Sequence, residues 1–293
     1  MTFRRILCPI DFSAVSGQAL GVATRLAMEH DSELVIVHAW NLAPLFAGEF
    51  VYPVEALRAL EEQAERGLAA AVTKARTNGV ARVSAIKLDG SPWHAIVDYA
   101  ERTPDIDLIV LGTRGRTGLV RAVWGSVAEM VARHAPCSVL AVPDGGAQPF
   151  LRVLCPIDFS PSSRYALDLV AELSRSAEPS VTLLHVIEPP RVYSEEPIEM
   201  SLDPGLVGPA HALLDQWGTD VAAKHPMRTV SEVRIGRART EIRALLDGGK
   251  PFDLVAMGSH GRTGLRRAVL GSVAEETLRH AHRAVLVARE RRA

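Results

Sequence analysis

The stretch GTRGRTGLVRAVWGS, residues 112–126, recurs as GSHGRTGLRRAVLGS at residues 258–272. Each copy contains Gly, two residues, Gly, nine residues and then Gly-Ser. Each follows a short apolar run typical of a buried strand and precedes a pattern typical of a helix. Glycines let backbone N–H groups approach an anion closely, and a helix N-terminus adds unpaired donors and partial positive charge. The two stretches therefore predict two phosphate-binding loops, each between a strand and a helix.

A second repeat shows that the whole chain is a tandem duplication. Leu7–Ser13, LCPIDFS, recurs unchanged as Leu154–Ser160. The segment Pro143–Phe150 between the copies is rich in Gly and Pro, which suits a linker. We therefore expect one domain over residues 1–143 and a second over residues 151–290, each long enough to bury its own core.

Within each half, short apolar runs alternate with helical patterns. The expected strands are Arg5–Ile10, Glu33–Ala39, Arg82–Leu88, Asp107–Leu111, Ser138–Val142, Arg152–Ile157, Val181–Ile187, Thr229–Ile235, Asp253–Met257 and Ala284–Ala288. Such alternation predicts an α/β fold with a parallel sheet flanked by helices on both faces. Continuous apolar runs are typical of strands that are buried on both faces.

Ligands of such sheets bind at the carboxyl ends of the strands, where the strand order reverses. If the first and fourth strands of each half are neighbours, Asp11 converges with the loop that begins at Gly112. By the same reasoning, Asp158 converges with the loop that begins at Gly258. The sequence thus predicts two crevices, one in each half.

Composition excludes several classes of protein. The 293 residues carry a formal net charge of −1 and are 47% hydrophobic, so no bulk charge favours nucleic acid or a membrane surface as a partner. No apolar run is long enough to span a bilayer, and the N-terminus does not read as a secretory signal. The three cysteines form no C-x-x-C pair, which fits reduced thiols and a cytoplasmic location.

The two loops are basic. Arginine and histidine occur at Arg114, Arg116, Arg121, His260, Arg262, Arg266 and Arg267. Several N–H donors and arginine forks acting together can hold a di- or triphosphate. Tight turns with solvated arginines are the alternative.

Other side chains near the crevices have two readings each. Asp11 and Asp158 accept hydrogen bonds from ribose hydroxyls or cap the following helix. Ser126 and Ser272 are expected to be helix N-caps and phosphate donors. His38 and His185 close the second strands and are expected to be structural, with their neighbours Ala39 and Val186 walling the pockets. Glu188–Gly208 carries five acids and is expected to be a mobile lid, or else a solvated variable loop.

The loop is not a Walker A motif, because Ser126 follows Gly125 with no lysine between them. We find no second carboxylate to hold Mg²⁺ or orient water, and no side-chain metal site. Phosphoryl transfer depends on a positioned metal and nucleophile. Binding is therefore better supported than hydrolysis, and no catalytic residue is assigned.

With the spacing G-x2-G-x9-G-S, the LCPIDFS strand and the segments DLIVLGTRGRTGL and GSVAE, the sequence resembles the universal stress protein family in its tandem form. The resemblance covers nearly the whole chain, twice, and points to the ATP-binding branch. It implies two tandem Rossmann-like domains, each with a five-stranded parallel sheet of order 3-2-1-4-5. It also implies pairing through the fifth strands, Ser138–Val142 and Ala284–Ala288, within the chain or in a homodimer.

The resemblance implies which residues surround ATP, with any Mg²⁺ held through the phosphates. In the first copy these are Pro9, Ile10, Asp11, Ala39, Gly112, Thr113, Arg114, Gly115, Arg116, Thr117, Gly118, Gly125, Ser126 and Val127. In the second copy they are Pro156, Ile157, Asp158, Val186, Gly258, Ser259, His260, Gly261, Arg262, Thr263, Gly264, Gly271, Ser272 and Val273.

The expected function is that of an ATP-binding stress-response sensor with two sites and little or no turnover. The alternatives are a slow ATPase or nucleotidyl-transfer enzyme of the same α/β class, and an interaction module that works without nucleotide.

Overall fold

A computed structural model of the chain describes residues 3–40, 54–114, 125–146, 149–189, 204–249, 251–261 and 270–290. The chain divides into two compact units. Met1–Gly146 and Arg289–Ala293 form the first, and Ala147–Ala288 form the second. Of the acidic segment Glu188–Gly208, residues 190–203 lie outside the described part, so its predicted role as a lid stays a prediction.

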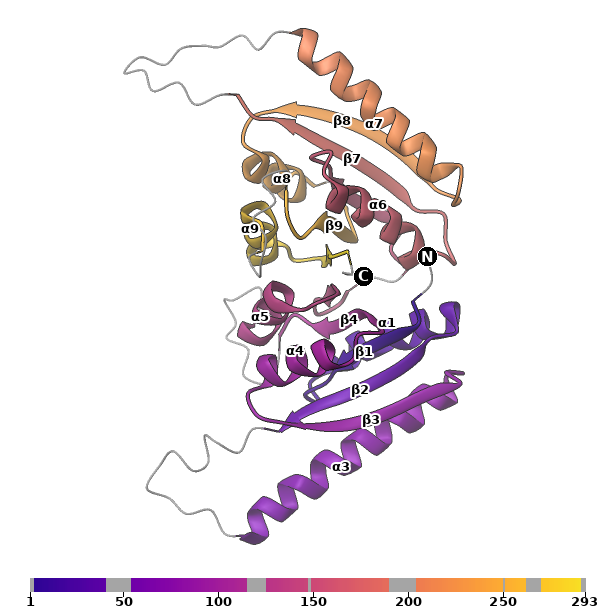
Figure 1. The fold of residues 1–293 in the computed structure, drawn as a ribbon, viewed down its shortest axis with the longest axis vertical. Helices are drawn as coiled ribbons and strands as arrows, with labels where there is room; N and C mark the ends of the chain where they lie inside the picture. Colours follow the sequence, from indigo (N-terminus) through magenta and orange to yellow (C-terminus); the bar gives the residue numbers. More distant parts are fainter. Residues whose placement is uncertain are drawn as a thin grey trace, which may run out of the picture. The chain divides into compact units, whose positions relative to one another are not determined.

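The first unit is a parallel α/β domain (Figure 1). Its elements are β1 (Arg5–Pro9), α1 (Ala14–His30), β2 (Glu33–Trp40), α3 (Val54–Thr77), β3 (Arg82–Asp89), α4 (Pro92–Arg102), β4 (Ile106–Gly112), α5 (Ser126–His134) and β5 (Ser138–Val142). The strands lie in the order β3-β2-β1-β4-β5, and every described pair is parallel. The predicted strand order is confirmed.

The second unit repeats this arrangement. Its elements are β6 (Arg152–Pro156), α6 (Pro161–Leu173), β7 (Ser180–Ile187), a 3-10 turn η1 (Pro204–Leu206), α7 (Val207–Ala222), β8 (Arg228–Ile235), α8 (Ala238–Asp247), β9 (Leu254–Gly258), α9 (Ser272–His280) and β10 (Ala284–Ala288). The order β10-β9-β6-β7-β8 is that of the first unit, with β6 in the place of β1.

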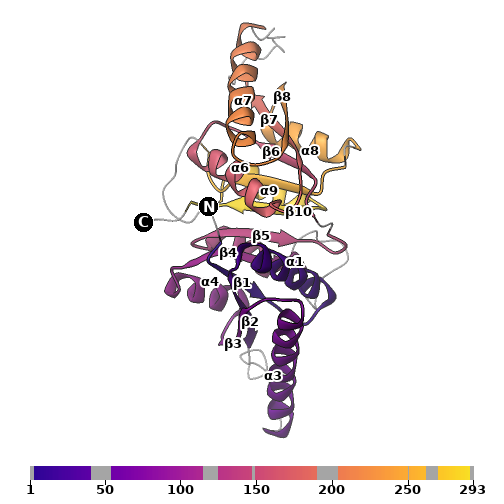
Figure 2. The same ribbon diagram turned by 90° about the vertical axis from the view of Figure 1, so that its right-hand side faces the viewer.

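The strand order dictates which helices share a face. From β1 the chain moves to β2 and β3 on one side, and then crosses to β4 and β5 on the other. Because crossovers between parallel strands are right-handed, this reversal puts α1 and α3 on one face and α4 and α5 on the other (Figures 1 and 2). The reversal lies between β1 and β4 in the first unit and between β6 and β9 in the second, where ligands of such sheets bind.

The central strands are buried on both faces, as their apolar runs predict. Ile6, Leu7 and Cys8 of β1 are all 0% exposed, whereas the outer strand β3 has exposed residues at both ends. Burial raises the pKa of the Cys8 and Cys155 thiols, and both, like Cys137, are buried. The three cysteines are therefore core residues rather than reactive groups.

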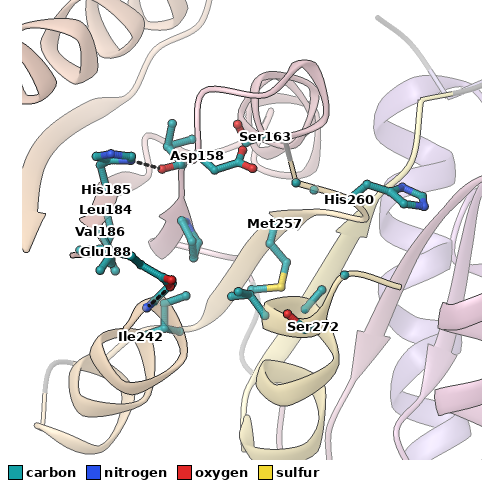
Figure 3. A pocket seen from close by; sticks show the side chains of 18 of the residues that line it. Asp158, Ser163, Leu184, His185, Val186, Glu188, Ile242, Met257, His260 and Ser272 are labelled. Atoms are coloured by element: carbon teal, nitrogen blue, oxygen red, sulfur yellow. Dashed lines mark hydrogen bonds between the residues drawn. The ribbon is translucent and has the colours of Figure 1, made fainter. Parts of the chain in front are cut away.

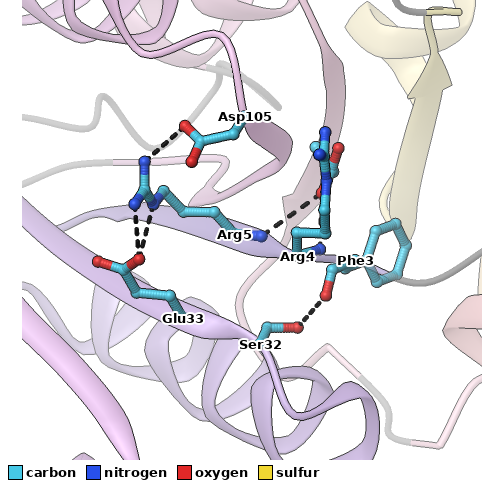
Figure 4. A network of polar contacts seen from close by, with 7 residues as sticks. Phe3, Arg4, Arg5, Ser32, Glu33 and Asp105 are labelled. Atoms are coloured by element: carbon cyan, nitrogen blue, oxygen red, sulfur yellow. Dashed lines mark hydrogen bonds and ion pairs between the residues drawn. The ribbon is translucent and has the colours of Figure 1, made fainter.

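Ion pairs hold the amino ends of the strands, at the end of the sheet away from the glycine loops (Figure 4). Arg5 of β1 bonds to Glu33 at the start of β2, at 2.7 Å, and to Asp105 before β4, at 2.5 Å. In the second unit, Asp253 accepts hydrogen bonds from the backbone and the guanidinium of Arg152. These contacts fix the register of neighbouring strands and leave the carboxyl ends free to form a site.

Candidate functional site

A cavity of about 570 Å³ opens at the carboxyl ends of β6, β7 and β9 in the second unit (Figure 3). This volume lies within the range of small-molecule sites. Ten of the residues predicted to surround a nucleotide line it: Pro156, Ile157, Asp158, Val186, Gly258, His260, Gly261, Gly271, Ser272 and Val273. The structure therefore brings together the end of β6 and the two ends of the glycine stretch.

A strained turn after β6 places Asp158 at the pocket. Phe159 has a φ of 61°, a left-handed conformation that costs a non-glycine residue roughly 1–2 kcal/mol. The turn ends at Ser160, the N-cap of α6, whose hydroxyl accepts from the Ser163 N–H at 3.2 Å. Asp158 Oδ1 accepts from the Ser160 N–H at 3.0 Å and from its hydroxyl at 2.6 Å. One carboxylate oxygen of Asp158 thus supports the start of the helix.

The second oxygen of Asp158 lies toward the glycine loop. A Cβ atom placed on Gly261 would lie 2.9 Å from Asp158 Oδ2. Asp158 is therefore not the helix cap that the alternative reading predicted, because the cap is Ser160 and Asp158 Oδ1 supports it. The contact of Asp158 with a ligand stays a prediction.

The first unit has the same turn. Phe12 has a φ of 63°, and Asp11 Oδ1 accepts from the Ser13 N–H at 3.1 Å and from its hydroxyl at 2.6 Å. Ser13 is the N-cap of α1. The same strained geometry in both copies indicates a feature that the fold maintains.

A histidine locks each turn to the neighbouring strand. His38 Nδ1 lies 2.8 Å from the Ile10 carbonyl, and His185 Nδ1 lies 2.7 Å from the Ile157 carbonyl. Because a carbonyl only accepts, Nδ1 carries the proton in both histidines. The Phe12 and Phe159 rings pack on these imidazoles, each with centroids 4.5 Å apart. The histidines are structural, as predicted, and His185 also lines the pocket.

The first glycine of each stretch has a packing reason for its small size. A Cβ on Gly112 would lie 3.0 Å from Val15 Cγ1 and 3.1 Å from the Val15 carbonyl carbon. A Cβ on Gly258 would lie 2.8 Å from the Ser162 carbonyl carbon. The carboxyl ends of β4 and β9 therefore pass so close to the first helix of their unit that a side chain does not fit.

The residue after this glycine closes the loop. The Thr113 N–H donates to Val142, and the Thr113 carbonyl accepts from the Gly125 N–H at 2.6 Å. Ser259 repeats both bonds, to Ala288 and from Gly271. Thr113 and Ser259 are 1% and 2% exposed. Their N–H groups are thus already bonded within the protein, so these two predicted site residues shape the loop from inside.

The helix that follows each loop begins at Ser126 or Ser272, but neither serine is its N-cap. The caps are Gly125 and Gly271, and neither helix start has a side-chain cap hydrogen bond. The prediction that Ser126 and Ser272 are N-caps is therefore wrong by one residue. Its physical reason is the bond from each cap glycine back to Thr113 or Ser259, which makes that glycine the last loop residue. The serines become the first helical residues, and Ser272 and Val273 line the pocket.

The pocket has one apolar wall that the sequence reading missed. Met257 at the end of β9 and Ile242 of α8 line it, together with Val186. Glu188 and Ala238 also line it and are joined by a hydrogen bond of 2.8 Å from the Ala238 N–H to Glu188 Oε1. Glu188 could have been predicted from the sequence, because it directly follows β7 and ligands of such sheets bind at the carboxyl ends of the strands.

The His260 ring is turned away from the other labelled side chains in Figure 3 and lies 2.8 Å from the Ser259 hydroxyl. Its backbone carbonyl accepts from the Ser162 hydroxyl at 2.5 Å. His260 thus ties the loop to α6.

In the first unit, the corresponding described residues occupy the same strand ends. Pro9, Ile10 and Asp11 end or follow β1, Ala39 is in β2, and Arg114 follows β4. The remaining predicted loop residues lie outside the described part of the chain: Gly115, Arg116, Thr117, Gly118, Arg262, Thr263 and Gly264. Their predicted contacts stay predictions.

Within the ranges that the structure describes, no group of three or more His, Cys, Asp or Glu side chains is placed to hold a metal ion. The same ranges contain no helix that is long and apolar enough to cross a membrane.

Comparisons with known proteins all point to one family. The sequence model described as the universal stress protein family matches residues 2–143 and again residues 149–289. A universal stress protein of Methanocaldococcus jannaschii is 36% identical over 145 residues, which are 48% of this chain and 82% of that protein. A universal stress protein of Mycolicibacterium smegmatis is 28% identical over 98% of this chain and 97% of its own length.

A solved structure shows the same two-unit fold. The universal stress protein of Archaeoglobus fulgidus aligns with a TM-score of 0.68 and 21% identity, over 99% of this chain and 98% of that one. The two-unit fold agrees with the family model, which matches once in each half of the sequence.

Proposed function

The chain belongs to the universal stress protein family, and we propose that it is an ATP-binding stress-response regulator with two nucleotide sites and little or no hydrolysis. Each site would lie at the carboxyl ends of the strands in one unit. The chain would act through what nucleotide occupancy does to its structure, rather than through turnover.

The observation that carries this proposal is the start of α9. The cap residue Gly271 has no side chain that could accept from the helix N–H groups, and Gly271, Ser272 and Val273 all line the pocket. The first N–H groups of a helix have no partner within it, and the helix dipole favours an anion there. Gly261 lines the same pocket. This end of the pocket suits the phosphates of a nucleotide.

The remainder of the pocket suits a nucleoside. Val186, Ile242 and Met257 provide apolar surface against which a flat base can pack. Asp158 also lines the pocket and has Oδ2 near Gly261 of the loop, where this oxygen can accept from ribose hydroxyls. Bound Mg²⁺ would be coordinated by phosphate oxygens and water, the usual arrangement for this ion.

Several features favour binding over hydrolysis. The loop has no Walker lysine. Asp158 Oδ1 already accepts two hydrogen bonds from Ser160, which commits that oxygen to the helix start. The role of this carboxylate is then to hold a ligand in place rather than to move a proton. A slow ATPase remains the alternative that the assay below addresses.

The test begins with the purified full-length chain. Denatured protein is analysed by ion-exchange chromatography for released nucleotide, refolded or nucleotide-stripped protein is titrated with ATP by calorimetry, and ATP hydrolysis is followed in parallel. We expect bound or rebound ATP, two sites per chain, and a rate far below the roughly 1–1,000 s⁻¹ of ordinary enzymes. If the protein releases no nucleotide on denaturation and also takes up none on titration, the proposal is refuted. Turnover above about 1 s⁻¹ would favour the ATPase.

A matched pair of variants locates the second site. Gly261→Val puts a side chain within 2.9 Å of Asp158 Oδ2, and the φ of Gly261 lies outside the left-handed region, so the backbone tolerates valine. Gly208→Val makes the same change in α7, where no described atom outside the adjacent backbone of the helix lies within 4 Å of the new Cβ. We expect Gly261→Val to reduce the ATP stoichiometry from two to one and Gly208→Val to leave it at two. Equal stoichiometry in both variants would mean that this pocket is not the site.

A further inference from the structure

Glu188 occupies the edge of the pocket farthest along the strand order from the glycine loop. In the order β9-β6-β7, the loop follows β9, Asp158 follows β6 and Glu188 follows β7. Both Glu188 and its partner Ala238 line the cavity. The pocket therefore runs across three strand ends, from the helix N-terminus of α9 to a carboxylate.

The Glu188 side chain is held in one orientation. Its Oε1 accepts from the N–H of Ala238, the first residue of α8, at 2.8 Å (Figure 3). The positive end of the α8 dipole favours this carboxylate. A carboxylate has further lone pairs beyond the one used here and only accepts hydrogen bonds when it is ionised. Glu188 thus presents fixed negative charge and acceptor capacity to whatever lies at this edge.

We propose that Glu188 sets the ligand specificity of the second site, by accepting hydrogen bonds from the uncharged nucleoside end of a nucleotide and repelling nucleotides with an additional anionic group at that end. This rests on the proposed function, which directs the phosphates toward α9 and so directs the nucleoside toward Glu188. The ligand class is a nucleotide whose only phosphates are on the 5′ side. Nucleotides that are also phosphorylated on the 2′ or 3′ hydroxyl are the disfavoured class, because like charges repel, although solvent screens this repulsion at the exposed Glu188.

The first copy has no acid at the equivalent sequence position. Glu188 is the third residue after His185, and the third residue after His38 is Asn41. The residue equivalent to Ala238 is Pro92, the first residue of α4, which has no N–H to hold an acid. The duplication therefore provides two sites of the same construction with different chemistry at the nucleoside end, and the selectivity belongs to the second.

Two variants separate charge from helix capping. Glu188→Gln keeps an oxygen that can accept from the Ala238 N–H but removes the charge, whereas Glu188→Ala removes both. The assay measures competition with ATP for binding to the full-length chain. The three competitors are AMP, adenosine 2′,5′-bisphosphate and adenosine 3′,5′-bisphosphate. The part of the ATP binding that is lost in Gly261→Val is assigned to the second site. A purely structural role would change the melting temperature in Glu188→Ala without changing the preference for AMP.

In the wild type we expect the second site to prefer AMP over at least one bisphosphate by about tenfold or more. Glu188→Gln and Glu188→Ala should both reduce this preference at least about fivefold. If wild type and Glu188→Gln prefer AMP equally, this inference is overturned while the proposed function stays intact. The same holds if only Glu188→Ala loses the preference. Failure of the wild type to bind ATP at all would overturn both.

Discussion

Replacing Asp158 separates the two roles that the structure gives to its two oxygens. Oδ1 accepts from the Ser160 N–H and hydroxyl at 3.0 and 2.6 Å, and Ser160 in turn caps α6. Hydrogen bonds to a charged group contribute about 1.5–3 kcal/mol each when buried, and Asp158 is only partly buried. The two bonds share one acceptor and are not additive, so Asp158→Ala should lower the free energy of unfolding by about 2 kcal/mol.

Asp158→Asn provides the contrast. Its carbonyl oxygen keeps the position of Oδ1, so the loss of stability should stay below about 1 kcal/mol. The charge that would accept from ribose hydroxyls is removed in both variants, and both should weaken ATP binding at the second site about tenfold. Urea denaturation and calorimetric titration measure the two effects on the same samples. If Asp158→Ala unfolds at the wild-type urea concentration, the capping argument is wrong. If Asp158→Asn binds ATP as tightly as the wild type, the Oδ2 argument is wrong.

Three further predictions concern stability and thiol chemistry. Gly258→Ala should destabilise the chain by about 1–3 kcal/mol in urea denaturation, because its Cβ would lie 2.8 Å from the Ser162 backbone. The control Gly17→Ala lies at an exposed position of α1, where the described residues place no atom outside the adjacent helix backbone within 4 Å of the new Cβ. This change should instead stabilise the chain by about 0.5–1 kcal/mol, and the same sign for both variants would contradict this reasoning. Arg289→Met should cost about 2 kcal/mol, since Arg289 donates to the Arg133 carbonyl at 3.1 Å near the end of α5, and an unchanged unfolding curve would count against that role. Cys8 and Cys155, whose thiol pKa values are raised by burial, should react with a thiol reagent only at the rate of unfolding, so fast labelling of native protein at neutral pH would show that they are accessible.

Most of the fold follows from local patterns in the sequence. The runs around Ile6 and Val110 are continuous because β1 and β4 are covered on both faces, so their apolar character and their burial have one cause. The strand order was available only through the family resemblance. Periodicity identifies strands but does not say which strands are neighbours, because pairing depends on tertiary contacts.

The site was less predictable than the fold. Thr113 and Ser259 look like loop residues, yet their N–H groups are bonded to the carbonyls of Val142 and Ala288. Only the alignment of strand ends across the sheet reveals this. Ile242 could not be found either, since nothing in the sequence says which residue of α8 faces the pocket. Glu188 could have been found, because the carboxyl end of a strand is where such sheets place functional side chains.

Comparison of the two copies distinguishes residues that are identical in both from residues that differ near the proposed sites. The unchanged stretch LCPIDFS contains an aspartate, a left-handed phenylalanine and a capping serine that depend on one another. Asp158 holds Ser160, Ser160 starts α6, and the ring of Phe159 packs on His185, which offsets the cost of its φ. A change at any one of these residues would remove a contact that another member of the turn makes, which gives a physical reason why the stretch is identical in both copies. The positions that differ between the copies, such as Asn41 and Glu188, lie outside this turn. Divergence at these positions would alter what each proposed site binds without disturbing the turn that both copies share.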